Sequence, residues 1–472
     1  MKKPFEWIRL PLWVFLGLLI FIPWPLGGFS PWAIQVLVLT TSVVTTAYFI
    51  LKLAGGQRGL PPILFLISIF SLIFQGWFMT LNAKFTSHLT TYFLLPINQI
   101  FPYLPGSLNR PVSLENIGRI IPLLAVSWMC ADVSRDSTWR KRIIVAMAVA
   151  GIAVVSFGIL EKISGPHRFW KEYGHNVWPF ASFYYHANAG AFINLVLPLV
   201  AALAWRSAFI DTSPWWRSLW ISGLVILLAG GLINASKGAL IVLLMLVFLL
   251  ALIAFRALRK IKDARHSIPA VLLVILLFCT TISLLAISAD IRTPFQRWAE
   301  AYEMREGIAS GRLQVAALCL KMSKEAGYLG FGPGTFESVF PYAAAVYGHA
   351  PSGHWRFAHE DYLQTLVEWG KIGLSIWCIL YFGGVASAFY QGLTSQNGLR
   401  QRDKFLLLCL GASLIGCAVH ALIDFPLQVP SIQLYVATMI GIAWGSWQWP
   451  HELSLVKKGK RRERGSRHHS KI

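Results

Sequence analysis

Apolar segments long enough to cross a membrane recur along the whole chain, and this feature constrains the fold most strongly. Each holds roughly 17 to 23 residues, and a helix of that length spans a hydrocarbon core of about 30 Å. Lipid offers no hydrogen-bond partners, so the backbone of each segment is expected to pair within itself as an α-helix. Polar and apolar residues do not alternate in these segments, which argues against a β-barrel. The predicted spans are residues 10–29, 32–51, 61–81, 116–131, 143–161, 188–205, 217–234, 238–256, 268–289, 372–391, 404–422 and 430–448.

The composition agrees with a membrane protein, because 56% of the 472 residues are hydrophobic and only 13% are charged. The predicted fold class is therefore all-α, a polytopic integral membrane protein with about 12 transmembrane helices. Residues 1–289 are expected to carry the first nine helices and residues 372–449 the last three. Residues 290–371 form a loop too long to be a simple connection. Residues 450–472 form a basic tail.

The basic residues predict the orientation of the chain in the membrane. With a cytoplasmic N-terminus, most of the 42 Lys and Arg residues fall in short cytoplasmic loops or in the tail, as the positive-inside rule requires. Both termini are then cytoplasmic and the loop 290–371 lies on the outer face. The net charge of +21 is thus explained by membrane edges and anionic lipid heads, without a nucleic-acid partner.

Processing signals and cysteines add little to this prediction. The first apolar segment lacks a small-residue cleavage site, so we expect a retained helix and not a signal peptide. Of the six cysteines, only Cys319 lies clearly in the outer loop. Neither a disulfide framework nor a cysteine metal site is predicted.

The outer loop contains two predicted helices joined by a glycine-rich turn. The stretch "GRLQVAALCLKMSKEAG" is typical of an amphipathic interfacial helix that ends at Gly327. The stretch "GYLGFGPGTF" demands a tight turn, and a second helix is expected at about 335–346. The apolar face of the first helix is predicted to comprise Leu313, Ala316, Ala317 and Leu320, opposite Lys321 and Lys324.

Polar residues converge on the outer side of this topology, where their cost near lipid makes them candidates for function. Structural alternatives exist for each of them. His186 and Asn188 could cap a helix, Lys237 could be a turn residue in water, and Arg312 could anchor an interfacial helix to lipid heads. The candidates are His186, Asn188, Lys237, Arg312, Arg356, His359, His420 and Asp424.

Two histidines have a further structural reading. His420 and Asp424 lie four residues apart, so they could form a hydrogen-bonded pair at a helix end. A helix that starts at Ala358 would place His359 on an apolar face with Tyr362, as in many core histidines. The neighbouring aromatic residues serve either as sugar-stacking groups or as interface anchors; they are Tyr184, Tyr185, Trp355 and Phe357.

The motifs "GYLGFGPGTFE" and "AHEDYLQTLVEWGKIGL" resemble the O-antigen ligase and polymerase family of bacterial envelope proteins. The family pattern is a "GxGPGxF" turn, then "HNxxL" running into "ExGxxGL" and a membrane helix. Here Glu360 follows the motif histidine where the family usually has Asn, and Lys237 stands where the family usually has Arg. The matching residues are Gly330, Gly332, Pro333, Gly334 and Phe336, then His359 and Leu363, then Glu368, Gly370, Gly373 and Leu374.

This resemblance implies a GT-C-like membrane glycosyltransferase of the bacterial inner membrane with a periplasmic active site. The donor would be a glycan on undecaprenyl pyrophosphate, and the acceptor a hydroxyl of another glycan or lipid. No cofactor and no metal are expected, since the sequence has no DxD motif and no His and Glu residues at a spacing typical of metal ligands. The expected partners are these two substrates and the lipid bilayer.

The resemblance also suggests roles for the candidate residues. His359 could accept the proton of the acceptor hydroxyl, with Glu360 or Asp424 orienting it or sharing that task. Arg312, Lys237 and Arg356 could stabilise the departing diphosphate. Backbone N–H groups of the glycine-rich turn could approach phosphate or sugar. The remaining predicted substrate contacts are Gly332, Gly334, Glu368, His186, Asn188, His420 and Asp424.

Several functions remain compatible with these motifs. A ligase is favoured, and a polymerase or a protein O-oligosaccharyltransferase would use the same residues. A transporter would need broken helices, repeats and midplane charges, which the sequence does not indicate. A flippase or scaffold for lipid-linked glycan would need the basic residues but not His359.

Overall fold

A computed structural model of the chain describes most of the helical bundle and most of the loop 290–371. The predicted helix 268–289 and the basic tail 450–472 lie outside the described residues. The described residues are 9–56, 59–87, 93–165, 179–209, 213–234, 236–259, 308–347, 354–394 and 398–449.

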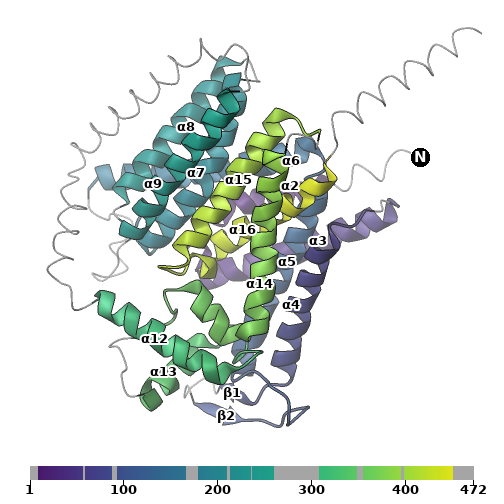
Figure 1. The fold of residues 1–472 in the computed structure, drawn as a ribbon, viewed down its shortest axis with the longest axis vertical. Helices are drawn as coiled ribbons and strands as arrows, with labels where there is room; N and C mark the ends of the chain where they lie inside the picture. Colours follow the sequence, from purple (N-terminus) through teal and green to yellow (C-terminus); the bar gives the residue numbers. More distant parts are fainter. Residues whose placement is uncertain are drawn as a thin grey trace, which may run out of the picture.

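The described structure is almost entirely helical, with one small two-stranded hairpin (Figure 1). The all-α prediction therefore missed the strands β1 (Phe85–Ser87) and β2 (Leu94–Pro96), which pair antiparallel. The helices are α2 (Arg9–Phe21), α3 (Pro31–Ala54), α4 (Ile63–Leu81), α5 (Arg110–Val133), α6 (Ser137–Ile163), α7 (His186–Phe209), α8 (Pro214–Ile233), α9 (Lys237–Leu258), α12 (Ile308–Ala326), α13 (Phe336–Tyr347), α14 (Asp361–Leu393), α15 (Gln401–His420) and α16 (Pro430–Gly445), with 3-10 turns η1 (Leu26–Gly28), η4 (Pro426–Gln428) and η5 (Ser446–Gln448).

Among the described residues, nine helices are long and apolar enough to cross a membrane. Helices α2 and α16 coincide with predicted spans but are shorter, with 13 and 16 residues. The expected first span, 10–29, was too long. Its helix ends at Phe21 because Pro23 and Pro25 cannot continue the hydrogen bonding, and Gly27 has a φ of +67°.

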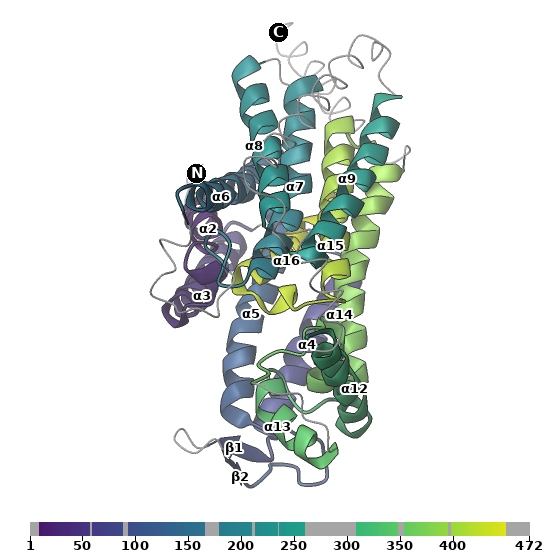
Figure 2. The ribbon, with the colours of Figure 1, turned by 90° about the vertical axis from the view of Figure 1, so that its left-hand side faces the viewer.

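Helix α7 forms the centre of the bundle (Figures 1 and 2). In its most apolar stretch, 94% of the α7 residues are buried, whereas the corresponding share is 28% in α3 and in α9. Helix α7 is therefore surrounded by protein, and α3 and α9 leave most of their apolar surface open to lipid. Its neighbours are α6, α8, α9 and α15. Helices α12 and α13 and the β-hairpin lie together at one end of the molecule (Figure 2).

Helix α12 has a second apolar face, which packs against α13. Leu313 and Leu320, on the predicted apolar face, are 72% and 52% exposed, so that face lies on the surface of the described structure, where an interfacial helix needs it. The periodicity of α12 indicated the first face and missed the second. The contacting core consists of Val315, Leu318, Cys319, Met322, Phe336, Val339 and Phe340.

Helix α14 consists of two segments, 361–369 and 371–393, that meet at Gly370. The φ of Gly370 is +67°, and a Cβ there would lie 2.4 Å from both Gly330 N and Tyr328 O. Glycine is therefore required on steric and conformational grounds. The close approach brings the end of the first segment onto the glycine-rich turn.

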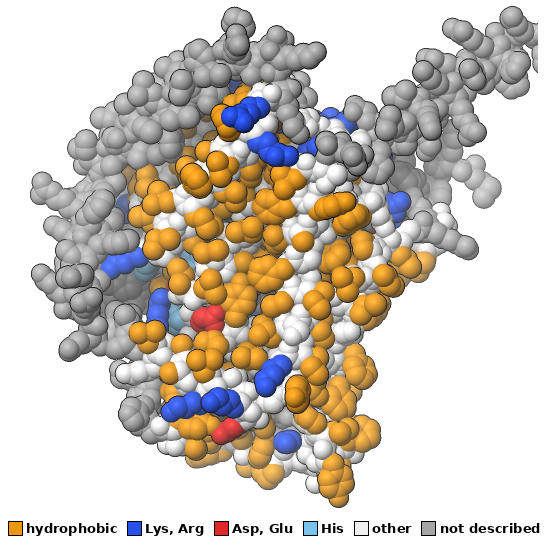
Figure 3. Space-filling model, viewed as in Figure 1, with side chains coloured by type: hydrophobic (Ala, Val, Ile, Leu, Met, Phe, Trp, Pro, Cys, Tyr) orange, Lys and Arg blue, Asp and Glu red, His pale blue; other side chains and the backbone are white. Residues whose placement is uncertain are grey.

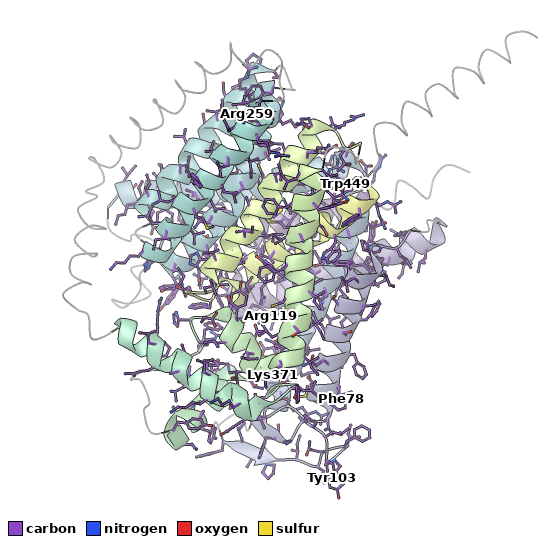
Figure 4. The ribbon with its side chains drawn as sticks, in the orientation of Figure 1. Phe78, Tyr103, Arg119, Arg259, Lys371 and Trp449 are labelled. Atoms are coloured by element: carbon purple, nitrogen blue, oxygen red, sulfur yellow. The ribbon has the colours of Figure 1, made fainter. Side chains whose placement is uncertain are left out.

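The surface of the bundle is dominated by apolar side chains, with most Lys and Arg toward its two ends (Figure 3). Arg259 and Trp449 lie at the end opposite Tyr103 and Lys371 (Figure 4). Two buried ion pairs join helices that are distant in the sequence. Lys52 lies 2.9 Å from Asp132, and Arg140 lies 2.9 Å from Asp403.

Candidate active site

The carboxylate of Asp424 joins four separate parts of the chain. His359 Nδ1 lies 3.1 Å from Asp424 Oδ1, and Arg312 Nη2 lies 3.7 Å from Oδ2. The hydroxyl of Tyr185 donates to Asp424 Oδ2 at 3.3 Å and accepts from Arg312 Nη2 at 2.9 Å. Asp424 is 3% exposed. A buried carboxylate is thus surrounded by three donors and held in one orientation.

The electrostatic environment keeps Asp424 ionised. Burial by itself would raise the pKa of Asp424, but the hydrogen bond with His359 and the positive charge of Arg312 bring that pKa below its ordinary value. Burial and the charge of Asp424 raise the pKa of Tyr185 to about 12. Tyr185 therefore remains a phenol at neutral pH and can donate its proton to the carboxylate.

His359 precedes the helix and does not lie on it, contrary to the predicted start at Ala358. The helix begins at Asp361, and His359 has a φ of +55°. A histidine in the left-handed region is uncommon and is held there by its surroundings. Ala358 N donates to Gln364 Oε1 at 3.1 Å, and the His359 ring meets Phe425 edge to face at 4.7 Å. The strained backbone turns the imidazole toward Asp424.

The hydrogen bond of Nδ1 determines which ring nitrogen can take a proton. A carboxylate accepts, so Nδ1 carries hydrogen and Nε2 carries the lone pair in the neutral ring. Within the described ranges, no hydrogen bond of Nε2 is found. The side chain of His359 is 23% exposed. The arrangement gives His359 an available basic nitrogen and a carboxylate that stabilises the protonated ring.

Aromatic side chains surround the imidazole. Tyr185 stacks on Phe425 with ring centroids 5.8 Å apart, and Phe357 stacks on the same ring at 4.5 Å. Trp355 meets His359 edge to face at 5.6 Å. These rings reduce the water around Asp424 and offer flat apolar surfaces of the kind that pack against sugars.

Glu360 does not contact His359, although it was expected to orient or assist it. Its carboxylate accepts from Leu363 N at 2.5 Å and caps the first turn of α14. Burial raises the pKa of Glu360. The departure from the usual family residue therefore has a local structural explanation, since Glu and Asn can both accept a bond from a helix N-terminus.

The glycine-rich turn was expected to offer N–H groups to a substrate, and the structure contradicts this for Gly332 and Gly334. Gly332 N donates to the carbonyl of Glu368 at 2.9 Å, and Gly334 N donates to Glu368 Oε2 at 3.0 Å. Phe336 N donates to the other carboxylate oxygen at 3.3 Å. Glu368 is 5% exposed and is used in fixing the turn and the start of α13. Gly332, Gly334 and Glu368, which were predicted to contact substrate, hold the turn together instead.

Lys237 is the first residue of α9, whose N-terminus lies close to the Asp424 segment. The next residue, Gly238, approaches Ile423 so closely that a Cβ would lie 2.5 Å from its side chain. The carbonyl of Ile423 accepts from Arg312 Nη1 at 3.1 Å. The Lys237 turn and Arg312 therefore both adjoin Ile423, the turn at its side chain and Arg312 at its carbonyl.

His186 and Asn188 belong to the first turn of α7 and flank the cluster. The His186 ring lies 5.0 Å from that of Tyr185. Asn188 is 4% exposed and its Oδ1 has no partner among the described residues. The side-chain amide of Asn234, in the "NASKGAL" turn, is likewise buried without a partner there. These amides are polar groups that a substrate could satisfy.

Neither His420 nor Arg356 makes a side-chain hydrogen bond to Asp424 among the described residues. His420 is 1% exposed, and its backbone carbonyl accepts from Asp424 N at 3.0 Å. The side chains of His420 and Asp424 are not hydrogen bonded, because α15 ends at His420 and the carboxylate turns to His359. Arg356 is exposed and lies 3.6 Å from Glu337 on α13. The structure does not bring Arg356 into contact with Asp424.

Two residues in the site were not among the predicted catalytic or substrate-binding groups: Tyr185, read as an aromatic contact, and Phe425. Both adjoin predicted residues in sequence, beside His186 and Asp424 respectively, and this proximity was the available signal. Across the described part of the chain, no three His, Cys, Asp or Glu side chains are placed to bind a metal ion.

Comparison with protein families supports the motif-based interpretation. Residues 222–378 match a family model described as O-antigen ligase. No curated protein matches the chain. The matched region includes Lys237, Arg312, the glycine-rich turn and His359, whereas Tyr185 and Asp424 lie outside it. The resemblance predicted from the motifs is thus confirmed for residues 222–378: this stretch, less than half of the chain, is similar to the O-antigen ligase family and belongs to a protein whose described helices include several long and apolar enough to span a membrane.

Proposed function

We propose that the protein transfers a glycan from undecaprenyl pyrophosphate to an acceptor hydroxyl at the periplasmic face of the inner membrane, without a metal ion. The observation that carries this proposal is the joint contact of His359 and Arg312 with one buried carboxylate, Asp424. A base and a cation held side by side suit a reaction in which a hydroxyl attacks and an anion departs.

The reaction would proceed by displacement at the anomeric carbon of the donor sugar. The acceptor oxygen forms a bond to this carbon, and the bond between the carbon and the diphosphate oxygen breaks. The hydroxyl proton passes to Nε2 of His359, and Asp424 stabilises the resulting imidazolium. The bonding electrons leave with the diphosphate, whose charge Arg312 stabilises.

The donor orientation follows from the positions of the cations. The side chain of Arg312 is 34% exposed, so its guanidinium can meet a phosphate oxygen without losing its contact to Tyr185. Lys237, whose neighbour Gly238 approaches Ile423, would contact the second phosphate as a point charge. The prenyl chain would remain in the lipid, and the sugar would rest against Phe425 and Trp355.

The acceptor class separates the members of this family. A ligase uses a lipid-anchored core glycan, a polymerase uses a growing chain, and a protein glycosylating enzyme uses a side chain. The ligase is our first choice because the matched family is described in that way. The other two remain outcomes of the experiment below.

The test is an assay of purified full-length protein with an undecaprenyl-pyrophosphate-linked glycan and a panel of acceptors, with and without EDTA. We expect transfer in EDTA and its loss in His359→Ala, by about 10² to 10⁴-fold. The control is Lys321→Ala on the exposed face of α12. Full transfer by His359→Ala, or a strict need for Mg²⁺ or Mn²⁺, would contradict the mechanism. Glycan movement across vesicles without bond formation would indicate a transporter or flippase.

A further inference from the structure

A cavity lies on the side of the Asp424 segment that faces away from His359. It has a volume of about 160 Å³ and is bordered by α5, both segments of α14, η4 and α16. Most of its lining is apolar and belongs to membrane-spanning helices, so its interior suits a hydrocarbon chain. The apolar lining includes Leu123, Leu124, Trp377, Tyr381, Val436 and Ile440.

One end of this cavity is polar and contains acceptors without donors. Asn116 lies near the outer end of α5, and Gln433 lies in the first turn of α16. Asn116 Oδ1 and Gln433 Oε1 are buried and have no hydrogen-bond partner among the described residues. A buried acceptor without a donor is unfavourable, so a ligand that brings hydroxyl groups would be stabilised here.

The two carboxylates in the lining do not compete for such a ligand. Asp361 accepts from Leu427 N at 2.9 Å and from Gln428 Nε2 at 3.0 Å. The carboxylate of Glu368 is occupied by Gly334 N and Phe336 N. The open polar positions of the cavity are therefore the amide oxygens, which recognise neutral donors such as sugar hydroxyls.

The cavity and the candidate active site share the segment from Asp424 to Gln428. On one side of it Asp424 binds His359, and on the other side Leu427 and Gln428 bind Asp361 and line the cavity. His359 and Asp361 are separated by one residue. A molecule in the cavity would thus lie next to the segment that positions His359.

We propose that this cavity binds one hydrocarbon chain of a lipid-anchored acceptor, with hydroxyl groups of its sugar head at Asn116 and Gln433. The proposal rests on the proposed function, because a transferase that holds its donor at Arg312 needs a second site for the acceptor. It adds that the protein recognises a lipid chain of the acceptor as well as its sugar.

The test is photocrosslinking of the full-length protein in phosphatidylcholine nanodiscs. The probes are a glucosyl diacylglycerol, a polyprenyl phosphate and a phosphatidylglycerol, each with a diazirine near the end of one chain. We expect the glycolipid probe to label peptides 374–382 and 433–440. Cys378→Phe fills the cavity and should reduce that labelling at least about fivefold. The matched control is Ile379→Phe, because Ile379 is 44% exposed on the same helix turn and does not line the cavity.

A second pair of variants tests the polar end. Asn116→Leu with Gln433→Leu should reduce labelling by the glycolipid probe at least about threefold and leave labelling by phosphatidylglycerol unchanged. Thermal unfolding of each variant identifies any loss of fold. If the Cys378→Phe protein does not fold, the Cys378→Leu variant is tested instead.

The outcomes separate this inference from the proposed function. Equal labelling by all three probes, unaffected by Cys378→Phe, would mean ordinary contact with bilayer lipid and would overturn the proposal. Preferential labelling by polyprenyl phosphate would assign the cavity to the donor and would also overturn it. Crosslinking needs no turnover, so specific glycolipid labelling in a protein without transferase activity would contradict only the proposed function.

Discussion

Asp424 Oδ1 lies 3.1 Å from His359 Nδ1, although the two residues are 65 positions apart. The contact pairs a buried carboxylate with a histidine whose backbone is held in the left-handed region. Such a pairing fixes the tautomer and the orientation of the imidazole. Because Asp424 also meets Arg312 through Tyr185, base and cation are positioned by a single side chain.

Asp424→Asn should lower kcat by about 10² to 10³-fold, because the neutral amide cannot stabilise protonated His359. If Asp424 acts through His359, the double variant Asp424→Asn with His359→Ala should have the same kcat as His359→Ala alone. Steady-state kinetics of both single variants and the double variant measure this. Additive losses would mean that Asp424 acts independently of His359.

Acidification should reveal the Asp424 contacts as a loss of stability. The pKa of Asp424 is lower in the folded protein than in the unfolded chain, where it is about 3.9. The stability that the Asp424 contacts provide is therefore fully present above the unfolded pKa. That contribution disappears as pH falls through the lower folded value. We expect the Tm in detergent to decline below about pH 4 in the native protein. Asp424→Asn should have a lower Tm at neutral pH and a shallower decline, and parallel curves would refute this account.

Arg312→Lys should retain part of the activity, losing about tenfold, whereas Arg312→Ala should lose about 10²- to 10³-fold. Lysine keeps the charge, but one nitrogen replaces the two guanidinium nitrogens that contact Ile423 O and Tyr185 at 3.1 and 2.9 Å. Rates of glycan transfer provide the comparison, with Lys321→Ala as the control on the same helix. Equal activity of the Lys and Ala variants would show that charge at this position is unimportant.

Glu360→Gln should keep nearly full activity, because a glutamine oxygen can still accept the Leu363 N–H. Glu360→Ala should lose about 1 kcal/mol of stability through the missing helix cap. Transfer assays and thermal unfolding distinguish the two effects. A large fall in kcat with Glu360→Gln at unchanged Tm would restore Glu360 as a catalytic group.

Gly370→Ala should lower the Tm strongly or prevent folding, since its Cβ would lie 2.4 Å from the backbone of Gly330 and Tyr328. Gly118→Ala is the control. Gly118 lies on α5 with nothing within 4 Å of the added carbon, and the change should raise helix stability by about 0.5 to 1 kcal/mol. Thermal unfolding of both variants tests the expected opposite signs. A Gly370→Ala protein with native Tm would show that the two backbones can separate at no cost.

The sequence by itself determined most of the helices, the apolar runs that could span a membrane and the long loop that holds the motif residues. These follow from apolar run length and turn chemistry, which are local properties. Local pattern was incomplete at two points. In α12 it missed the second apolar face that packs against α13, and near Ala358 it started a helix too early, because Glu360 caps α14 and the helix begins at Asp361.

Only the tertiary structure decided which polar residues share a site. Sequence spacing placed His420 beside Asp424, but the carboxylate turns to His359, and Glu368 binds the glycine-rich turn in place of a substrate. Tyr185 joined the site through a packing arrangement of α7, α12 and the Asp424 segment that no local pattern encodes. The physical reason is that hydrogen bonds of buried carboxylates are satisfied by whichever donors the packed bundle brings within reach, regardless of their separation along the chain.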